Sequence, residues 1–152
     1  MSTPLRFRTE LLRKDPSLPV FIRIPGATVA AWKLSDWKTV EGTLDGHDFG
    51  RRTIKDWAKD SPDRFVEFLK PFLDDAGLKP GDSVDVDLRL ADMTMPPEMA
   101  ARMKSDPEYA RAYEALNPNH KRKAIEHYLE AKSPAGRTAR LDKISRSIKA
   151  RL

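Results

Sequence analysis

The sequence predicts an α+β protein, in which a small N-terminal β-barrel with one helix is followed by a C-terminal module of three to four short helices. Three observations lead to this fold class. Before residue 91, apolar residues alternate with polar ones in short runs, which is typical of half-buried strands. After residue 91, apolar residues recur at helical spacing. Three prolines in that later part directly follow residues that cap helices well.

The first part of the chain is predicted to form mainly β structure. Alternation runs through LRFRTELL (5–12), VFIRIP (20–25) and SVDVDLRL (83–90), so each is predicted to be a strand with one buried face. Within TVEGTLDGHDFGRRTI, Asp45 and Gly46 supply the positive φ angles of a tight hairpin turn. These strands indicate a small barrel or, as the alternative, an open α+β sandwich.

One amphipathic helix is predicted between the hairpin and the last strand. Ser61 is placed to cap its start, and Pro62 to take the first helical position. The side chains on its apolar face are Phe65, Phe68, Leu69 and Phe72. Pro71 is expected to interrupt this helix. Gly77 is expected to end it, because glycine adopts the left-handed conformation found after helix C-termini.

The second part of the chain is predicted to be helical throughout. Three helices begin at a capping residue followed by proline, namely Asp106-Pro107, Asn117-Pro118 and Ser133-Pro134, and a shorter one opens at Pro96-Pro97. The apolar stripes of the three capped helices are narrow, so the helices are expected to pack on one another. The stripes are Tyr109, Tyr113 and Leu116; Ile125, Tyr128 and Leu129; and Leu141, Ile144 and Ile148. The predicted domains are residues 1–92 and 93–152.

Composition limits the possible functions. The 152 residues include no Cys, which excludes disulfides, thiolate nucleophiles and Cys-based zinc sites. The sequence begins without the apolar core of a signal peptide, and no stretch approaches the roughly 18 apolar residues of a membrane span. We therefore expect a soluble, cytoplasmic protein, and no cofactor is predicted.

The positive charge of the chain is concentrated in its last quarter. The formal net charge is +5, yet residues 117–152 hold ten Lys or Arg against three acids. An anionic partner, either nucleic acid or another anionic surface, would meet this region first. The candidate contact residues are Lys121, Arg122, Arg137, Arg140 and Lys143. The alternative interpretation is that these charges form the solvated face of a helical module.

The sequence contains no motif that identifies an active site. The histidines His120 and His127 are seven residues apart, which is too far for the i, i+4 spacing of a shared metal, so no metal site and no catalytic residue are predicted. The remaining enzymatic hypothesis is a pocket in the barrel, where aromatic rings give apolar contact and arginine binds an anion. Its candidate residues are Arg51, Arg52, Trp32 and Trp57, with Trp37 nearby. The alternative is that these tryptophans belong to the core.

The C-terminal residues carry a family resemblance. Three blocks have characteristic spacing: Leu116, Pro118, His120 and Lys121; Glu130, Ala131 and Lys132; and Arg137, Arg140, Leu141 and Lys143. Over residues 95–148 the chain resembles the bacteriocin-protection, YdeI or OmpD-associated family. The segments VEGTLDGHDFGRRTI and GLKPGDSVDVDL are similar to the domain of unknown function 1905, a small β-barrel that often precedes this helical module. The resemblance implies the same two-part fold and a link to tolerance of cationic antimicrobial peptides, and it supplies no catalytic residues.

Three functional hypotheses follow. The first is a bacterial, non-enzymatic binding or stress-tolerance protein whose basic helices contact an anionic partner. The second is a small-molecule sensor or enzyme that uses the Trp/Arg pocket of the barrel. The third is an interaction module whose narrow helical stripes are completed by a partner or by self-association.

Overall fold

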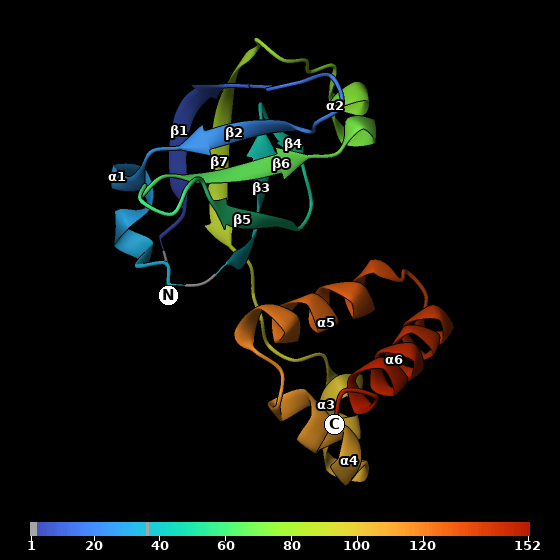
Figure 1. The fold of residues 1–152 in the computed structure, drawn as a ribbon. Helices are drawn as coiled ribbons and strands as arrows, with labels where there is room; N and C mark the ends of the chain where they lie inside the picture. Colours follow the sequence, from blue (N-terminus) through green and yellow to red (C-terminus); the bar gives the residue numbers. More distant parts are fainter. Residues whose placement is uncertain (1–2, 36) are drawn as a thin grey trace. The chain divides into compact units, whose positions relative to one another are not determined.

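The computed structural model describes residues 3–35 and 37–152, and the chain divides into two compact units, Met1–Ala91 and Asp92–Leu152 (Figure 1). We refer to them as the barrel unit and the helical unit. Each has its own hydrophobic core, formed in the first case by strands and in the second by helices. The architecture is therefore α+β, with strands and short helices first and helices alone afterwards, as predicted.

The barrel unit is a mixed sequence of strands and short helices. Within the described residues its strands are β1 (Leu5–Glu10), β2 (Val20–Ile24), β3 (Lys38–Leu44), β4 (His47–Asp48), β5 (Arg52–Asp56), β6 (Arg64–Phe68) and β7 (Ser83–Leu90). Between β2 and β3 lie helix α1 (Gly26–Val29) and the 3-10 helix η1 (Ala30–Trp32), and α2 (Lys70–Ala76) precedes β7. One helix was predicted for this unit, and the structure has α2 together with the short α1 and η1.

The strands form one antiparallel sheet that curls into a nearly closed barrel (Figure 1). Their order is β1-β7-β3-β5-β6-β2, and β4 pairs with the end of β3. The two edges of this sheet meet just after β1, where Leu12 and Phe21 exchange two backbone hydrogen bonds of 2.9 Å. This bridge joins the chain that follows β1 to β2 at the far edge of the sheet, which favours the barrel over the open sandwich.

Alternation of side chains places the core inside the barrel. In β7, Val84, Val86 and Leu88 are 2% exposed or less, while the residues between them face outward. The predicted hairpin is present, since Leu44 pairs with His47 across Asp45 and Gly46, whose φ angles are 48° and 81°. Because the interior positions hold aliphatic and aromatic side chains, the barrel contains a packed hydrophobic core.

The helix predicted to run from Ser61 to Gly77 is wrong in its first part, residues 61–69. Residues Arg64–Phe68 form β6, which pairs with both β2 and β5 and places Val66 and Phe68 in the core. Ser61 does not cap a helix; its hydroxyl accepts a hydrogen bond from the backbone N–H of Asp63. A five-residue run rich in Phe and Val is compatible with both strand and helix periodicity. Hydrogen bonding to two neighbouring strands stabilises the strand conformation here.

The real helix of this region, α2, begins one residue before Pro71 and ends at Gly77. Pro71 therefore opens the helix rather than interrupting it, because proline is well tolerated in the first turn. Gly77 has φ 70°, and its N–H bonds the carbonyls of Leu73 and Asp74. The predicted role of Gly77 in ending the helix is confirmed.

The helical unit begins its helices at the predicted caps. The helices are α3 (Pro97–Ser105), α4 (Pro107–Glu114), α5 (Pro118–Glu130) and α6 (Pro134–Lys149). The side chains of Asp106, Asn117 and Ser133 accept hydrogen bonds of 3.1, 2.8 and 3.0 Å from backbone N–H groups in the first turns of α4, α5 and α6. Each cap satisfies a donor that the helix leaves without an intrahelical partner.

A compact core holds these helices together. Met99 of α3, Tyr109 of α4 and Leu141 of α6 are completely buried, and Ile125 and Tyr128 of α5 are 5% exposed. The Tyr128 hydroxyl donates a hydrogen bond of 2.9 Å to Glu98, which also accepts one from the Thr138 hydroxyl. The apolar stripes predicted for α4, α5 and α6 thus meet within this unit.

Candidate functional site

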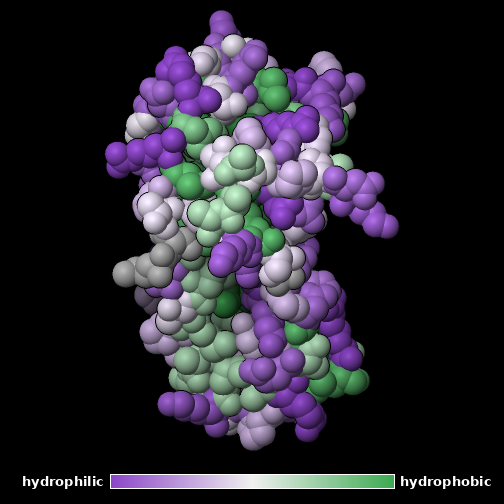
Figure 2. Space-filling view, turned by 90° about the vertical axis from the view of Figure 1, so that its left-hand side faces the viewer, coloured by the Kyte–Doolittle hydropathy of each residue, from purple (hydrophilic) through white to green (hydrophobic). Residues whose placement is uncertain are grey.

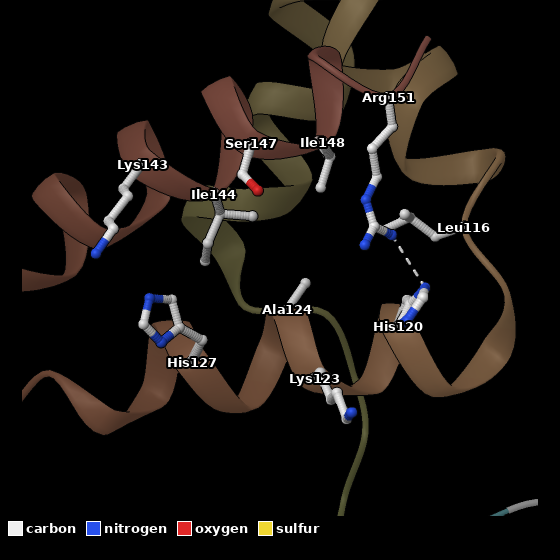
Figure 3. A pocket seen from close by; sticks show the side chains of 10 residues that line it. All are labelled: Leu116, His120, Lys123, Ala124, His127, Lys143, Ile144, Ser147, Ile148 and Arg151. Carbon is white, nitrogen blue, oxygen red and sulfur yellow. Dashed lines mark hydrogen bonds between the residues drawn. The ribbon is translucent and has the colours of Figure 1, made fainter.

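A groove lies between α5 and α6, which run antiparallel and are joined by residues 131–133 (Figure 3). Its volume is about 240 Å³. We define the α5/α6 groove by the residues that line it: Leu116, His120, Lys123, Ala124, His127, Lys143, Ile144, Ser147, Ile148 and Arg151. All of these residues belong to the helical unit, so the groove is built within one compact body.

The groove has an apolar middle and polar ends. Ala124, Ile144 and Ile148 form its central part, and each is less than a tenth exposed. Lys143 and His127 face each other across one end in Figure 3, while Arg151 meets His120 at the other. Residues three, four and seven positions apart share a helix face, which is why these side chains line up along α5 and α6.

The charge of the lining is entirely positive. Lys123 and Lys143 are exposed, and among residues 3–35 and 37–152 neither forms an ion pair with a carboxylate. No Asp or Glu is among the ten residues that line the groove. Two uncompensated ammonium groups and one guanidinium above an apolar floor favour an anion that also has an apolar part.

Each histidine of the groove lies beside an arginine. A guanidinium nitrogen of Arg151 lies 3.1 Å from Nδ1 of His120. Nδ1 of His127 lies 3.4 Å from Arg140 and 3.7 Å from the Glu130 carboxylate. At the His127 end of the groove, the Glu130 carboxylate is therefore close to the histidine, whereas the contact of His120 is with Arg151.

Two of the predicted contact residues, Arg137 and Arg140, bind the end of α5. The Arg137 guanidinium donates to the backbone carbonyl of Ala131 over 2.9 Å and lies 5.8 Å from the Tyr128 ring. Arg140 donates to the carbonyl of His127 over 2.9 Å and to Glu130 over 3.0 Å. Arginines at these positions satisfy carbonyls that the helix C-terminus leaves without partners and complement its negative dipole end.

Two others, Lys121 and Arg122, are also engaged within the unit. Lys121 pairs with Glu114 over 3.3 Å. Arg122 is only 7% exposed and donates to the Asn119 side chain over 2.8 Å. Burial lowers the pKa of the Arg122 guanidinium, and the Glu126 carboxylate opposes this shift. Of the five predicted basic residues, the α5/α6 groove includes Lys143.

The structure distributes the predicted Trp/Arg set over several environments. Trp32 belongs to the barrel core and donates its indole N–H to the Thr3 carbonyl over 2.9 Å. Arg51 lies 3.9 Å from the Glu41 carboxylate. Arg52 donates to the Glu67 backbone carbonyl over 2.8 Å, and burial lowers the pKa of its guanidinium against the opposing effect of the Glu67 carboxylate.

Trp57 lies in a separate aromatic cluster on the barrel unit. Its ring centroid is 5.6 Å from Phe21 and 5.9 Å from Phe65. The Lys14 ammonium and the Arg23 guanidinium lie 4.5 and 4.3 Å from the Trp57 ring. A pocket of about 190 Å³ adjoins the cluster, lined by Lys14, Leu18, Pro19, Phe21, Trp57, Phe65 and Glu67. Trp37, in contrast, is 37% exposed.

The space-filling view shows the hydropathy of one face of the molecule (Figure 2). Hydrophilic side chains cover much of the face drawn in Figure 2, with apolar side chains between them on both units.

Within the described residues, no three His, Asp or Glu side chains gather closely enough to hold a metal ion. No helix in that same part of the chain has the length and apolar character needed to cross a membrane.

Sequence reasoning missed most of the groove. It treated Ile144 and Ile148 only as packing positions and considered His120 as a metal ligand, and it did not select Lys123 or Arg151. The available signal was the spacing of 120, 124 and 127 on α5 and of 144, 148 and 151 on α6, which places both sets on facing surfaces. Which helix faces oppose each other depends on the tertiary packing. The residue pattern of one helix does not specify that packing.

A family comparison adds to this geometry. Residues 92–151 match the family model described as Bacteriocin-protection, YdeI or OmpD-Associated. The matched range coincides with the helical unit, including the whole α5/α6 groove. No curated protein matches the chain.

Proposed function

We propose that this protein is a non-enzymatic binding protein of bacterial stress tolerance whose helical unit contacts an anionic partner through the α5/α6 groove. The observation that carries the proposal is the charge of Lys123 and Lys143, which pair with no carboxylate among the described residues, beside an apolar floor without a lining acid. Opposite charge would supply attraction and fast encounter, and the floor would supply contact area. The match of the helical unit to a family described by bacteriocin protection supports a role in tolerance.

The lining of the groove favours an anionic amphiphile or lipid-like surface over a nucleic acid. Proteins that hold single-stranded nucleic acids usually stack bases on aromatic rings. The middle of the groove instead has the aliphatic side chains of Ile144 and Ile148, and Ala124 opposite them. We extend the proposal to tolerance of cationic antimicrobial peptides, with the protein acting from the cytoplasm.

The test is a binding titration of the intact protein against anionic vesicles, zwitterionic vesicles and mixed RNA, at low and at physiological salt. We expect salt-sensitive binding to the anionic vesicles, because screening weakens contacts between exposed charges. The double variant Lys123→Gln/Lys143→Gln should lose most of this binding. The matched control Lys132→Gln/Arg146→Gln removes two exposed positive charges outside the groove and should lose much less. Equal losses in the two variants would refute a role for the groove.

The pocket beside Trp57 favours a second candidate function, small-molecule binding by the barrel unit. Its three aromatic rings would give apolar contact, and Lys14 and Glu67 would offer polar contacts at its edge. A thermal-shift screen of small ligands tests this function. Hits should shift the unfolding temperature of the intact protein and lose their effect in Trp57→Leu; hits that persist in this variant would place the ligand elsewhere.

A further inference from the structure

The groove combines two properties that a simple anion does not need. An inorganic anion requires donors alone, and the basic residues at the rim would suffice for it. The apolar strip of Ala124, Ile144 and Ile148 lies between the two cationic ends, as Figure 3 shows. Contact with this strip stabilises a ligand only if the ligand brings apolar surface of its own. The groove is thus suited to one molecule with both an anionic and an apolar part.

The dimensions of the groove limit the size of that molecule. Its volume of about 240 Å³ exceeds the roughly 150 Å³ of a cavity that holds benzene and lies below the roughly 300 Å³ at which typical drug-sized sites begin. From Lys143 to Arg151 the axis of α6 advances about 12 Å. A head group and one short chain fit this space, whereas the two chains of a phospholipid do not.

The position of the head group follows from the charges at the two ends. At the Lys143 end, the Glu130 carboxylate lies 3.7 Å from His127 and is shared with Arg140, so an acid partly offsets the positive charge there. At the Arg151 end, the guanidinium meets His120 in the first turn of α5, where the helix dipole is positive. Lys123 lies one turn further along α5. A planar guanidinium also binds phosphate or carboxylate oxygens through two N–H groups at once.

We infer that the α5/α6 groove binds a free single-chain amphipathic anion, an alkyl phosphate or alkyl carboxylate, with its head group at Arg151 and its chain along Ala124, Ile144 and Ile148. This inference rests on the proposed function, because both require an anionic ligand at the groove. It adds that the ligand is a free molecule with a single chain, that one molecule binds per protein chain, and the direction in which the ligand lies.

The experiment is isothermal titration of the intact protein at low salt with inorganic phosphate, butyl phosphate and octyl phosphate, the last below its micelle concentration. Each methylene that becomes buried should tighten binding about fourfold. Octyl phosphate should therefore bind far more tightly than inorganic phosphate, with one molecule per chain. Uncharged 1-octanol is the comparison ligand for the head group and should bind at least tenfold more weakly than octyl phosphate.

Three variants test the placement. Arg151→Gln should weaken octyl phosphate binding about tenfold or more, whereas Arg146→Gln, which removes a charge from the same helix outside the groove, should change it less than twofold. Ser147→Phe places a ring at the exposed Ser147 position and should block the chain without changing any charge. The thermal unfolding of each variant is measured first, and a variant that unfolds early is replaced by Arg151→Lys or Ser147→Leu.

The outcomes separate the two proposals. Equal binding of inorganic and octyl phosphate would overturn the inference about the chain and leave the anionic contact standing. Equal binding of octyl phosphate and octanol would overturn the proposed function, since charge would then contribute nothing. If Arg151→Gln behaves like Arg146→Gln, the head group does not lie at Arg151 and the inferred orientation is wrong.

Discussion

The ammonium of Lys149 lies 2.7 Å from Oδ2 of Asp106, the residue whose other carboxylate oxygen caps α4 through the N–H of Tyr109. A single side chain thus begins one helix and anchors the end of another. Lys149, one of the basic residues near the C-terminus, therefore helps to hold the helices of the helical unit together. Lys149 belongs with Arg137 and Arg140 as a structural cation, and not with Lys123 and Lys143 at the groove.

Acid is predicted to destabilise the helical unit through Asp106. The hydrogen bond from Lys149 and then that from the Tyr109 N–H hold the pKa of Asp106 below its ordinary value of 3.8. A depressed folded-state pKa contributes stability above the unfolded-state value, and this stability is lost as the pH falls through the folded-state pKa. Thermal unfolding followed by circular dichroism from pH 7 to pH 2 should show the loss beginning below about pH 5.

The variant Asp106→Asn tests this assignment. Asparagine retains the ability to cap a helix but does not titrate, so the variant should unfold at lower temperature at pH 7 and show a smaller further loss in acid. Asp142→Asn is the control, because Asp142 also pairs with a basic side chain, that of Arg102, but lies within α6 and caps no helix. Identical pH profiles for wild type and Asp106→Asn would show that this carboxylate does not carry the dependence.

Two tyrosines of the helical core should respond oppositely to removal of their hydroxyls. The Tyr109 hydroxyl is buried without a hydrogen-bond partner among the described residues, and burial raises its pKa to about 12. Removing an unsatisfied buried group relieves its desolvation cost, so Tyr109→Phe should raise the free energy of unfolding by about 1 kcal/mol. Tyr128→Phe removes the 2.9 Å hydrogen bond to Glu98 and should lower it by about 1 kcal/mol.

Chemical denaturation of the two variants beside wild type measures this difference. The pair forms its own control, because each substitution deletes one oxygen from a buried ring. A loss of stability in Tyr109→Phe equal to that in Tyr128→Phe would mean that the Tyr109 hydroxyl has a partner in solution.

Gly42 is predicted to be the least replaceable glycine of the barrel. A Cβ at this position would lie 1.8 Å from the backbone carbonyl oxygen of Asp87 on the paired strand β7. Gly42→Ala must therefore displace β3 from β7 and should cost about 3 kcal/mol or more. Gly46→Ala meets no atom within 4 Å and should cost only about 1–2 kcal/mol, from its positive φ angle. Urea unfolding compares them, and equal losses would contradict the close approach of β3 and β7.

Removal of the Arg140 charge should affect stability and leave ligand binding intact. Arg140→Gln deletes hydrogen bonds to the His127 carbonyl and to Glu130, which should lower the free energy of unfolding by about 1 kcal/mol. The groove retains Lys123, Lys143 and Arg151, so the affinity for anionic vesicles should change less than twofold. A tenfold loss of affinity without a loss of stability would place Arg140 in the binding surface.

Local chemistry explains where prediction of the fold succeeded. A capping side chain followed by proline fixes a helix start within four residues, and Asp106, Asn117 and Ser133 all cap as expected. Asp45 and Gly46 likewise specify a hairpin from two positions. Residues 64–68 failed because Phe65, Val66 and Phe68 suit either state, and the deciding hydrogen bonds come from β2 and β5. Strand pairing involves residues far apart in the sequence, so a short run does not by itself indicate whether it will pair as a strand.

The candidate site was harder to predict because the sequence does not show which basic side chains find partners within the folded unit. Lys121, Arg122, Arg137 and Arg140 looked equivalent to Lys143 in the sequence. Their engagement with Glu114, Asn119 and the carbonyls at the end of α5 depends on how the helices pack. The groove exists only where the faces of α5 and α6 meet, and this geometry separates the cations that bind inside the unit from those that remain available.

One measurement tests the central claim most directly: mapping backbone amide shifts of the ¹⁵N-labelled intact protein during titration with octyl phosphate at low salt. If the α5/α6 groove is the binding site, the largest shifts will fall in residues 116–127 and 143–151 and will follow one saturation curve. Shifts concentrated around Phe21, Trp57 and Phe65, with the α5 and α6 amides unchanged, would contradict the account and place ligand binding in the barrel unit.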